Sequence, residues 1–294
     1  MSLLAQIALR LPDGTAVEHS AAAGIVVALY VALLSLGLLT AIGLAFFFQH
    51  RHVDWDERKR LLTARPWRAA EALGMLALLV VMQLATTLLV AAVRKFAHTT
   101  PADTTQLVTQ TLLLDWLGLA LVAALLVWRR LPWHTAFGTS WRSLGRCAVQ
   151  GTLGFLAVLP FFWFYSALYE LGLRWCGIEP ELQKVAVTIT DEQPLGLRIY
   201  LLGVAVAVAP FFEEILFRGI ILPVLSKRLG VGRAIIVVAV LFAAVHLHVP
   251  ALLPLFVMSV AFSLAYLYTG NLLVPVIMHG LFNAFNLALL TALR

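Results

Sequence analysis

Long apolar runs restrict what this chain can fold into. A helix needs about 20 mostly apolar residues to cross the roughly 30 Å hydrocarbon core of a bilayer. Runs of about that length follow one another along the whole sequence, at residues 21–48, 69–94, 107–128, 148–173, 199–225, 233–249, 251–269 and 272–293. The sixth run is the shortest. The pattern predicts an all-α, polytopic integral membrane protein with about eight transmembrane helices.

The composition supports a membrane protein. Of the 294 residues, 62% are apolar and 12% are charged, which is about half the charged fraction of an ordinary soluble domain. The first run is a poor signal peptide, because about 20 residues of mixed polarity precede it and charge follows it. Cys147 and Cys176 form no CxxC pair, so neither a disulfide framework nor a thiolate metal site is indicated.

The net charge of +6 is concentrated in three loops, at residues 49–68, 129–147 and 226–233. The connections between them, near 97–106 and 174–198, are poorer in basic residues for their length. Basic loops of a membrane protein face the cytoplasm, so both termini are expected on the opposite side. The basic loops are therefore interpreted as topology determinants that also contact anionic lipid heads. No nucleic-acid partner is expected.

Residues 174–198 form the longest polar connection and divide the chain into two membrane regions. Residues 1–173 hold about four spans without a recognisable function, and residues 199–294 hold about four more. Polar groups at membrane depth are sparse in the first region, where Asp115 is given no catalytic role. The second region collects Glu213, Glu214, Arg218, His246, His279, Asn283 and Asn286. Ionisable side chains are costly at this depth and mark function, so the chemistry is expected in residues 199–294.

Two adjacent carboxylates and an arginine lie in the stretch PFFEEILFRG, residues 210–219. Glu214 and Arg218 are four residues apart, so they can pair on one helix face. Glu213 lies about 100° around the helix and cannot share the arginine in the same way. Pro210 precedes the acidic pair and can kink the helix. Glu213 is therefore expected to face a group on another span.

The candidate partners of Glu213 are His246, and His279 with Asn283, which are again four residues apart. A carboxylate and a histidine that converge on a water form a general-base pair. A second histidine and an amide can stabilise an oxyanion. An alternative is a divalent metal such as zinc, which Glu213, His246 and His279 would hold, although no HExxH motif occurs.

Three motifs in this region resemble those of the CAAX protease and bacteriocin-processing family, the CPBP or ABI family of intramembrane endopeptidases, and its type II CAAX prenyl endopeptidases in particular. They are Glu213-Glu214-xxx-Arg218, Phe242-xxx-His246 and His279-xxx-Asn283. Their order and spacing match over roughly residues 198–290, and residues 1–173 show no match.

The resemblance implies a glutamic-type endopeptidase. Glu213 and His246 would activate the attacking water, and His279 and Asn283 would hold the oxyanion. Glu214 and Arg218 would support and orient these groups, and Phe242 would pack against the histidine. No cofactor is required on this interpretation.

The expected substrate is a membrane-associated peptide or protein tail, with or without a prenyl group, in a prokaryotic inner membrane. Two alternatives of other classes are open: a non-catalytic immunity protein that binds a partner, and a proton-coupled transporter, for which a line of Glu and His at membrane depth is equally natural.

Overall fold

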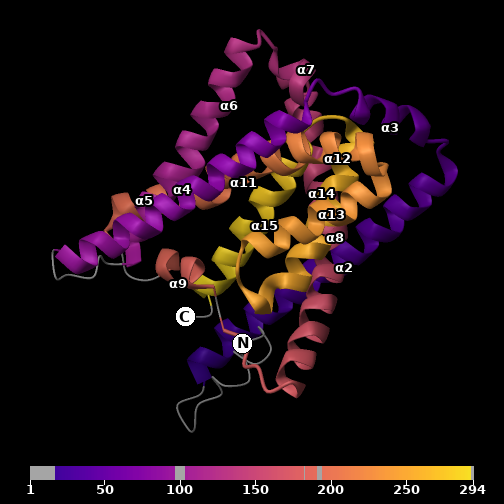
Figure 1. Ribbon diagram of the computed structural model, residues 1–294. Helices are drawn as coiled ribbons and strands as arrows, with labels where there is room; N and C mark the ends of the chain where they lie inside the picture. The colour runs from indigo at the N-terminus through magenta and orange to yellow at the C-terminus, as the bar shows by residue number, and fades with distance from the viewer. Residues whose placement is uncertain (1–16, 97–102, 182, 191–193, 293–294) are drawn as a thin grey trace.

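The computed structural model describes residues 17–96, 103–181, 183–190 and 194–292, and every regular element in these ranges is helical (Figure 1). The first half contains α2 (Val17–His50), α3 (Trp55–Thr63), α4 (Ala69–Phe96), α5 (Asp103–Thr111), η1 (Leu112–Trp116), α6 (Leu117–Trp128), α7 (Trp133–Phe137), η2 (Trp141–Ser143) and α8 (Leu144–Trp175). The second half contains α9 (Lys184–Thr190), α10 (Leu195–Gly203), η3 (Val204–Val208), α11 (Ala209–Glu214), η4 (Ile215–Ile221), α12 (Leu222–Leu229), α13 (Val231–Val245), η5 (Val249–Ala251), α14 (Leu252–Thr269) and α15 (Leu273–Ala292).

Seven of the described helical stretches are long and apolar enough to cross a membrane, so the all-α, multi-pass prediction is confirmed. The sixth expected span is shorter than expected, because α13 has 15 residues and ends at Val245. At 1.5 Å per residue it covers about 22 Å, less than the hydrocarbon core. His246 follows as its cap, and Leu247 turns the chain in a left-handed conformation with φ of 49°. The turn into α14 is therefore expected below the membrane surface.

The three basic loops meet at one end of the molecule, where Figure 1 shows α3 and α7. Lys227 Nζ of α12 donates to the backbone oxygens of Arg65 and Trp67, at 2.6 and 2.9 Å. Arg129, which follows α6, forms an ion pair of 2.7 Å with Glu71 of α4 and donates to the carbonyl oxygen of Pro66 at 3.2 Å. These contacts join residues from all three loops, as a common position on one membrane face requires. Segment α9 lies toward the other end (Figure 1).

The carboxy-terminal helices form the centre of the fold. One buried cluster joins η4, α12, α13 and α14 to α4, α6 and α7, and a second joins α8, α14 and α15. The amino-terminal helices α4 and α6 reach outward from this centre (Figure 1). The first region thus contributes walls around the second, and the polar residues of the second region lie between helices that pack on several sides.

Candidate active site

The acidic pair lies on a helical stretch that is interrupted by two π turns. The stretch Leu195–Leu229 has 35 residues, and η3 and η4 flank the short segment α11 that ends in Glu214. Pro210 stands in the first turn of α11, directly after η3. A proline has no N–H to donate, and a π turn accommodates one extra residue at such an interruption. The local irregularity predicted from Pro210 is present.

Glu214 and Arg218 form the ion pair that their spacing predicts. Arg218 Nη1 lies 2.9 Å from Glu214 Oε1, and both side chains are completely buried. Arg218 Nη2 also donates to Ser259 Oγ at 2.6 Å and to the Ser259 carbonyl oxygen at 3.1 Å. The guanidinium lies 4.6 Å from the ring centre of Phe242. The charge of Arg218 is thus compensated by a carboxylate, hydrogen bonds and an aromatic face.

His279 connects this ion pair to the second carboxylate. Its Nδ1 lies 3.0 Å from Glu214 Oε1, and its Nε2 lies 3.9 Å from Glu213 Oε2. Because Glu214 is paired with Arg218 and accepts, Nδ1 carries the proton of this hydrogen bond. The ring stacks on Phe262 with centroids 5.1 Å apart. His279 is therefore held in one orientation, with Nε2 directed toward Glu213.

Glu213 faces another span, as predicted. Its side chain is 26% exposed, in contrast to the fully buried Glu214. Its Oε2 atom is buried and has no hydrogen-bond partner among the described residues. A buried carboxylate oxygen without a partner is costly, so its presence at an open edge indicates a place for a donor such as water or substrate. Asp115 of η1 is near enough for its charge to interact with that of Glu213.

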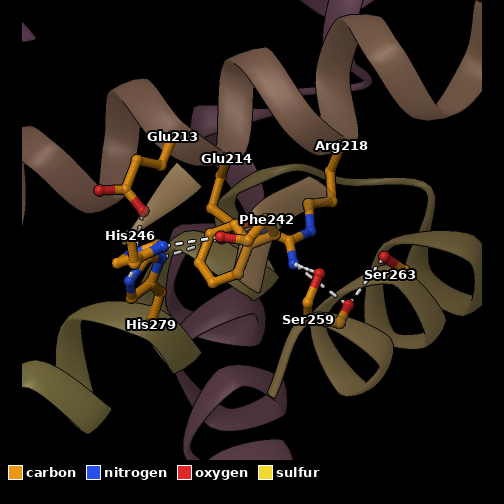
Figure 2. A network of polar contacts seen from close by, with 8 residues as sticks. All are labelled: Glu213, Glu214, Arg218, Phe242, His246, Ser259, Ser263 and His279. Atoms are coloured by element: carbon orange, nitrogen blue, oxygen red, sulfur yellow. Dashed lines mark hydrogen bonds and ion pairs between the residues drawn. The ribbon is translucent and has the colours of Figure 1, made fainter. Parts of the chain in front are cut away.

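His246 lies beside these groups at the end of α13. Its Nδ1 is 2.7 Å from the carbonyl oxygen of Phe242, which can only accept, so Nδ1 is the protonated nitrogen. In the neutral ring Nε2 then carries the lone pair. Figure 2 shows the side chains of Glu213, His246 and His279 together at one end of the polar network. The ring of Phe242 contacts both histidines, with its centroid 4.9 Å from that of His246 and 5.9 Å from that of His279.

Asn283 is tied to a different element from His279, although the two share a face of α15. Its Nδ2 donates to the carbonyl oxygen of Ala205 in η3 at 2.8 Å. The helices approach closely here because Gly280 has no side chain: a Cβ at this position would lie 2.6 Å from the Val206 oxygen. One amide N–H of Asn283 is therefore used within the protein, and the amide has a second N–H.

Sequence reasoning missed three residues of α14. Ser259 binds Arg218, Ser263 Oγ donates to the Ser259 carbonyl oxygen at 2.8 Å, and Phe262 stacks on His279. All three are buried. The sequence feature that could have identified them is the pair Ser259 and Ser263, which are four residues apart within an apolar span. This spacing places two small polar groups on one helix face.

The metal alternative requires a ligand set among the described residues. Among them, no group of three or more His, Cys, Asp or Glu side chains is arranged to hold an ion. The Nδ1 atoms of His246 and His279 are both used in hydrogen bonds within the protein, which leaves both Nε2 atoms free to bind a ligand. Of the set Glu213, His246 and His279 that the metal alternative requires, His279 Nε2 and Glu213 Oε2 lie 3.9 Å apart.

The comparisons with known proteins agree with this geometry. Residues 195–285 match the family described as "Type II CAAX prenyl endopeptidase Rce1-like". The resemblance to the CAAX proteases is confirmed for these residues. All seven residues of the three motifs fall within the range. No solved structure matches the chain.

A curated relative is a "Putative membrane peptidase YdiL" from Bacillus subtilis (strain 168). It is 28% identical to this chain over 165 residues, which are 56% of this chain and 65% of the relative. The chain thus spans slightly less than two thirds of that protein. The family match covers the carboxy-terminal half alone, so the CAAX-protease features are those of residues 195–285.

Proposed function

We propose that this protein is an intramembrane endopeptidase that hydrolyses a peptide bond in a membrane-associated peptide or protein tail. Two observations carry the proposal: His279 Nε2 lies 3.9 Å from Glu213 Oε2, and the ring of Phe242 contacts both His279 and His246. The family match and the name of the bacterial relative support a protease. A transporter or a partner-binding protein does not need these three side chains at one place.

In the proposed reaction, Glu213 and Nε2 of His246 hold the attacking water, and one of them takes its proton. The oxygen of the water forms a bond to the carbonyl carbon of the scissile amide. The carbonyl oxygen then carries the negative charge, and the proton passes to the nitrogen of the leaving amine as the carbon–nitrogen bond breaks. General-base catalysis of this kind contributes about 10²–10⁴-fold to the rate.

The oxyanion would be stabilised by His279 and Asn283. A protonated His279 ring donates from both nitrogens, from Nδ1 to Glu214 and from Nε2 to the developing charge. The N–H of Asn283 that does not bind Ala205 is the second donor. Such donors act most strongly where water is excluded and the donors are already oriented. Glu214 and Arg218 would not touch the substrate, and they would position His279.

The proposed chemistry uses no metal, and a zinc-dependent reaction is the alternative. The printed name of the matching family refers to prenylated CAAX substrates, so a prenylated tail is one candidate substrate class for this chain. An unprenylated membrane-tethered peptide is the other.

The test is cleavage of membrane-tethered peptides, prenylated and unprenylated, by detergent-purified protein with and without a strong chelator. We expect Glu213→Gln to lower the cleavage rate by at least about 100-fold, because a carboxamide cannot accept the proton. The matched control is Glu71→Gln, which removes a half-buried carboxylate far from the site in sequence and paired with Arg129. It should retain cleavage if the protein stays folded.

The outcomes separate the hypotheses. Loss of cleavage in Glu213→Gln, with no effect of the chelator on the original protein, supports water activation by the carboxylate. Loss of cleavage on chelation points to the metal reaction instead. If Glu213→Gln cleaves as fast as the original protein, or keeps the cellular function in full, the endopeptidase proposal is wrong.

A further inference from the structure

A cavity of about 330 Å³ lies beside the candidate active site. Its walls come from the second half of α8, from Pro180, Glu181 and residues 183–189, from Ala205 of η3, from the turn between α13 and α14, from the first half of α14 and from the second half of α15. Since α8 and α15 both start at the end where the basic loops meet, the cavity lies toward the opposite end of the bundle.

The cavity is connected to the site through α15 and η3. Asn283 and Ala205, which share a hydrogen bond, both line it. Asn283 is one turn along α15 from His279, or about 6 Å. A chain that occupies the cavity and continues past Asn283 therefore reaches the place where Glu213 and the two histidines meet. The walls beyond Asn283 are mainly apolar, and include Met258 and Leu287.

Two polar atoms on α8 lack partners at this cavity. Trp163 Nε1 and Glu170 Oε2 are both buried and have no hydrogen-bond partner among the described residues, and both residues line the cavity. Each atom left unsatisfied costs free energy. Trp163 offers a donor and Glu170 offers an acceptor. A ligand that satisfies both must carry an acceptor near one and a donor near the other.

The spacing of the two atoms matches a short peptide. Trp163 and Glu170 are seven residues apart on α8, which is two turns or about 10 Å. An extended peptide covers about 3.3 Å per residue, so about three residues bridge the two positions. The peptide carbonyl is the natural acceptor for the indole N–H. Next to a carboxylate in an apolar wall, the favoured donor is a cation.

Among the described residues, Arg174 is the basic group nearest to Glu170 along α8. It lies one turn further along the helix and interacts with Glu170 through charge; its Nη1 forms a 2.8 Å ion pair with Glu179, and its Nη2 is buried without a hydrogen-bond partner. Glu181 at the cavity is exposed. His248, from the turn after α13, also lines the wall. Glu170 is thus the carboxylate on the inner wall that is best placed to receive a ligand's positive charge.

We propose that this cavity is a substrate subsite for an extended, apolar peptide segment of about three residues with a positive charge at its far end. The Trp163 N–H binds a backbone carbonyl of the segment, and Glu170 binds the cation. The cation is a lysine or arginine side chain or a free amino terminus. This specificity rests on the proposed endopeptidase function, because a peptide bound in the subsite would place its scissile bond next to Glu213.

The test measures binding rather than cleavage, so that it does not depend on catalysis. Fluorescent peptides of equal length and hydrophobicity bind to the Glu213→Gln protein in detergent. One carries an internal lysine and a blocked amino terminus, one carries norleucine and a free amino terminus, and one carries norleucine and a blocked terminus. We expect the uncharged peptide to bind at least about tenfold more weakly than the better of the two cationic ones.

Three further variants, each added to Glu213→Gln, separate the contacts. Glu170→Gln should weaken only the better-binding of the two cationic peptides, by about 10-fold or more. Trp163→Phe keeps an aromatic ring but removes the N–H, so it should weaken all three peptides to a similar extent, by a few-fold. Glu181→Gln changes an exposed carboxylate on the same cavity and should have a much smaller effect than Glu170→Gln, because water screens its charge.

Equal binding of the three peptides, or an equal loss for all of them in Glu170→Gln, would overturn the proposed cation subsite. Unchanged binding in Trp163→Phe would overturn the backbone contact. If the charge preference holds while no peptide is ever cleaved by the original protein, the binding site stands and the endopeptidase proposal fails. Cleavage without any charge preference gives the reverse conclusion.

Discussion

Removal of the Arg218 charge tests the polar network most directly. We consider Arg218→Met, which keeps much of the side-chain length and removes the guanidinium. In the structure this change leaves Glu214 buried, with His279 as its remaining donor, and removes both bonds to Ser259. It also removes the cation from the face of Phe242.

The expected loss of stability follows from the complete burial of the pair. Removing one partner of a buried ion pair costs about 3–5 kcal/mol, mainly because the other charge is left uncompensated. With roughly 2–4 °C per kcal/mol for a chain of this order of size, the unfolding midpoint should fall by about 6–20 °C. In Glu214→Gln/Arg218→Met the stranded charge is absent, so the double variant should be more stable than Arg218→Met alone.

The assay is thermal unfolding of the detergent-purified variants, followed by tryptophan fluorescence. Lys59→Met is the control, because it breaks a pair of similar length with Asp56 in which both side chains are exposed, and it should leave the midpoint unchanged. Should Arg218→Met not yield folded protein, Arg218→Lys keeps the charge and should show a smaller loss. If the double variant is as unstable as Arg218→Met or worse, the reasoning from an uncompensated charge is refuted.

Two other predictions concern packing and orientation. Gly280→Ala should lower the unfolding midpoint, because its Cβ would lie 2.6 Å from the Val206 oxygen, whereas Gly172→Ala, with nothing within 4 Å, should not. A midpoint that is equal in both variants would contradict the close approach of α15 and η3. A membrane-impermeant maleimide should label exposed Cys176 on intact cells and leave buried Cys147 unmodified. If Cys176 is labelled only after the cells are opened, the orientation of the protein in the membrane is opposite to the expected one.

The sequence by itself determined the features that depend on one helix at a time. The apolar runs predicted the membrane helices, because length and hydropathy alone decide whether a segment can cross. The four-residue spacing predicted the Glu214–Arg218 pair, because the helical period fixes which side chains share a face. The same reasoning separated Glu213 from Arg218. Among the predicted spans, the length of α13 differed clearly from the prediction, because apolar residues continue past the turn that ends the helix.

The tertiary structure decided which helix supplies each partner. The sequence offered two histidines for Glu213, and the packing of α15 against α11 places His279 between both carboxylates. It also gave Arg218 a serine of α14 as a second partner and tied Asn283 to η3. Contacts between helices depend on crossing angles and on small residues such as Gly280, which a single sequence does not specify. The cavity beside Trp163 and Glu170 arises for the same reason, since several segments far apart in the sequence form its walls.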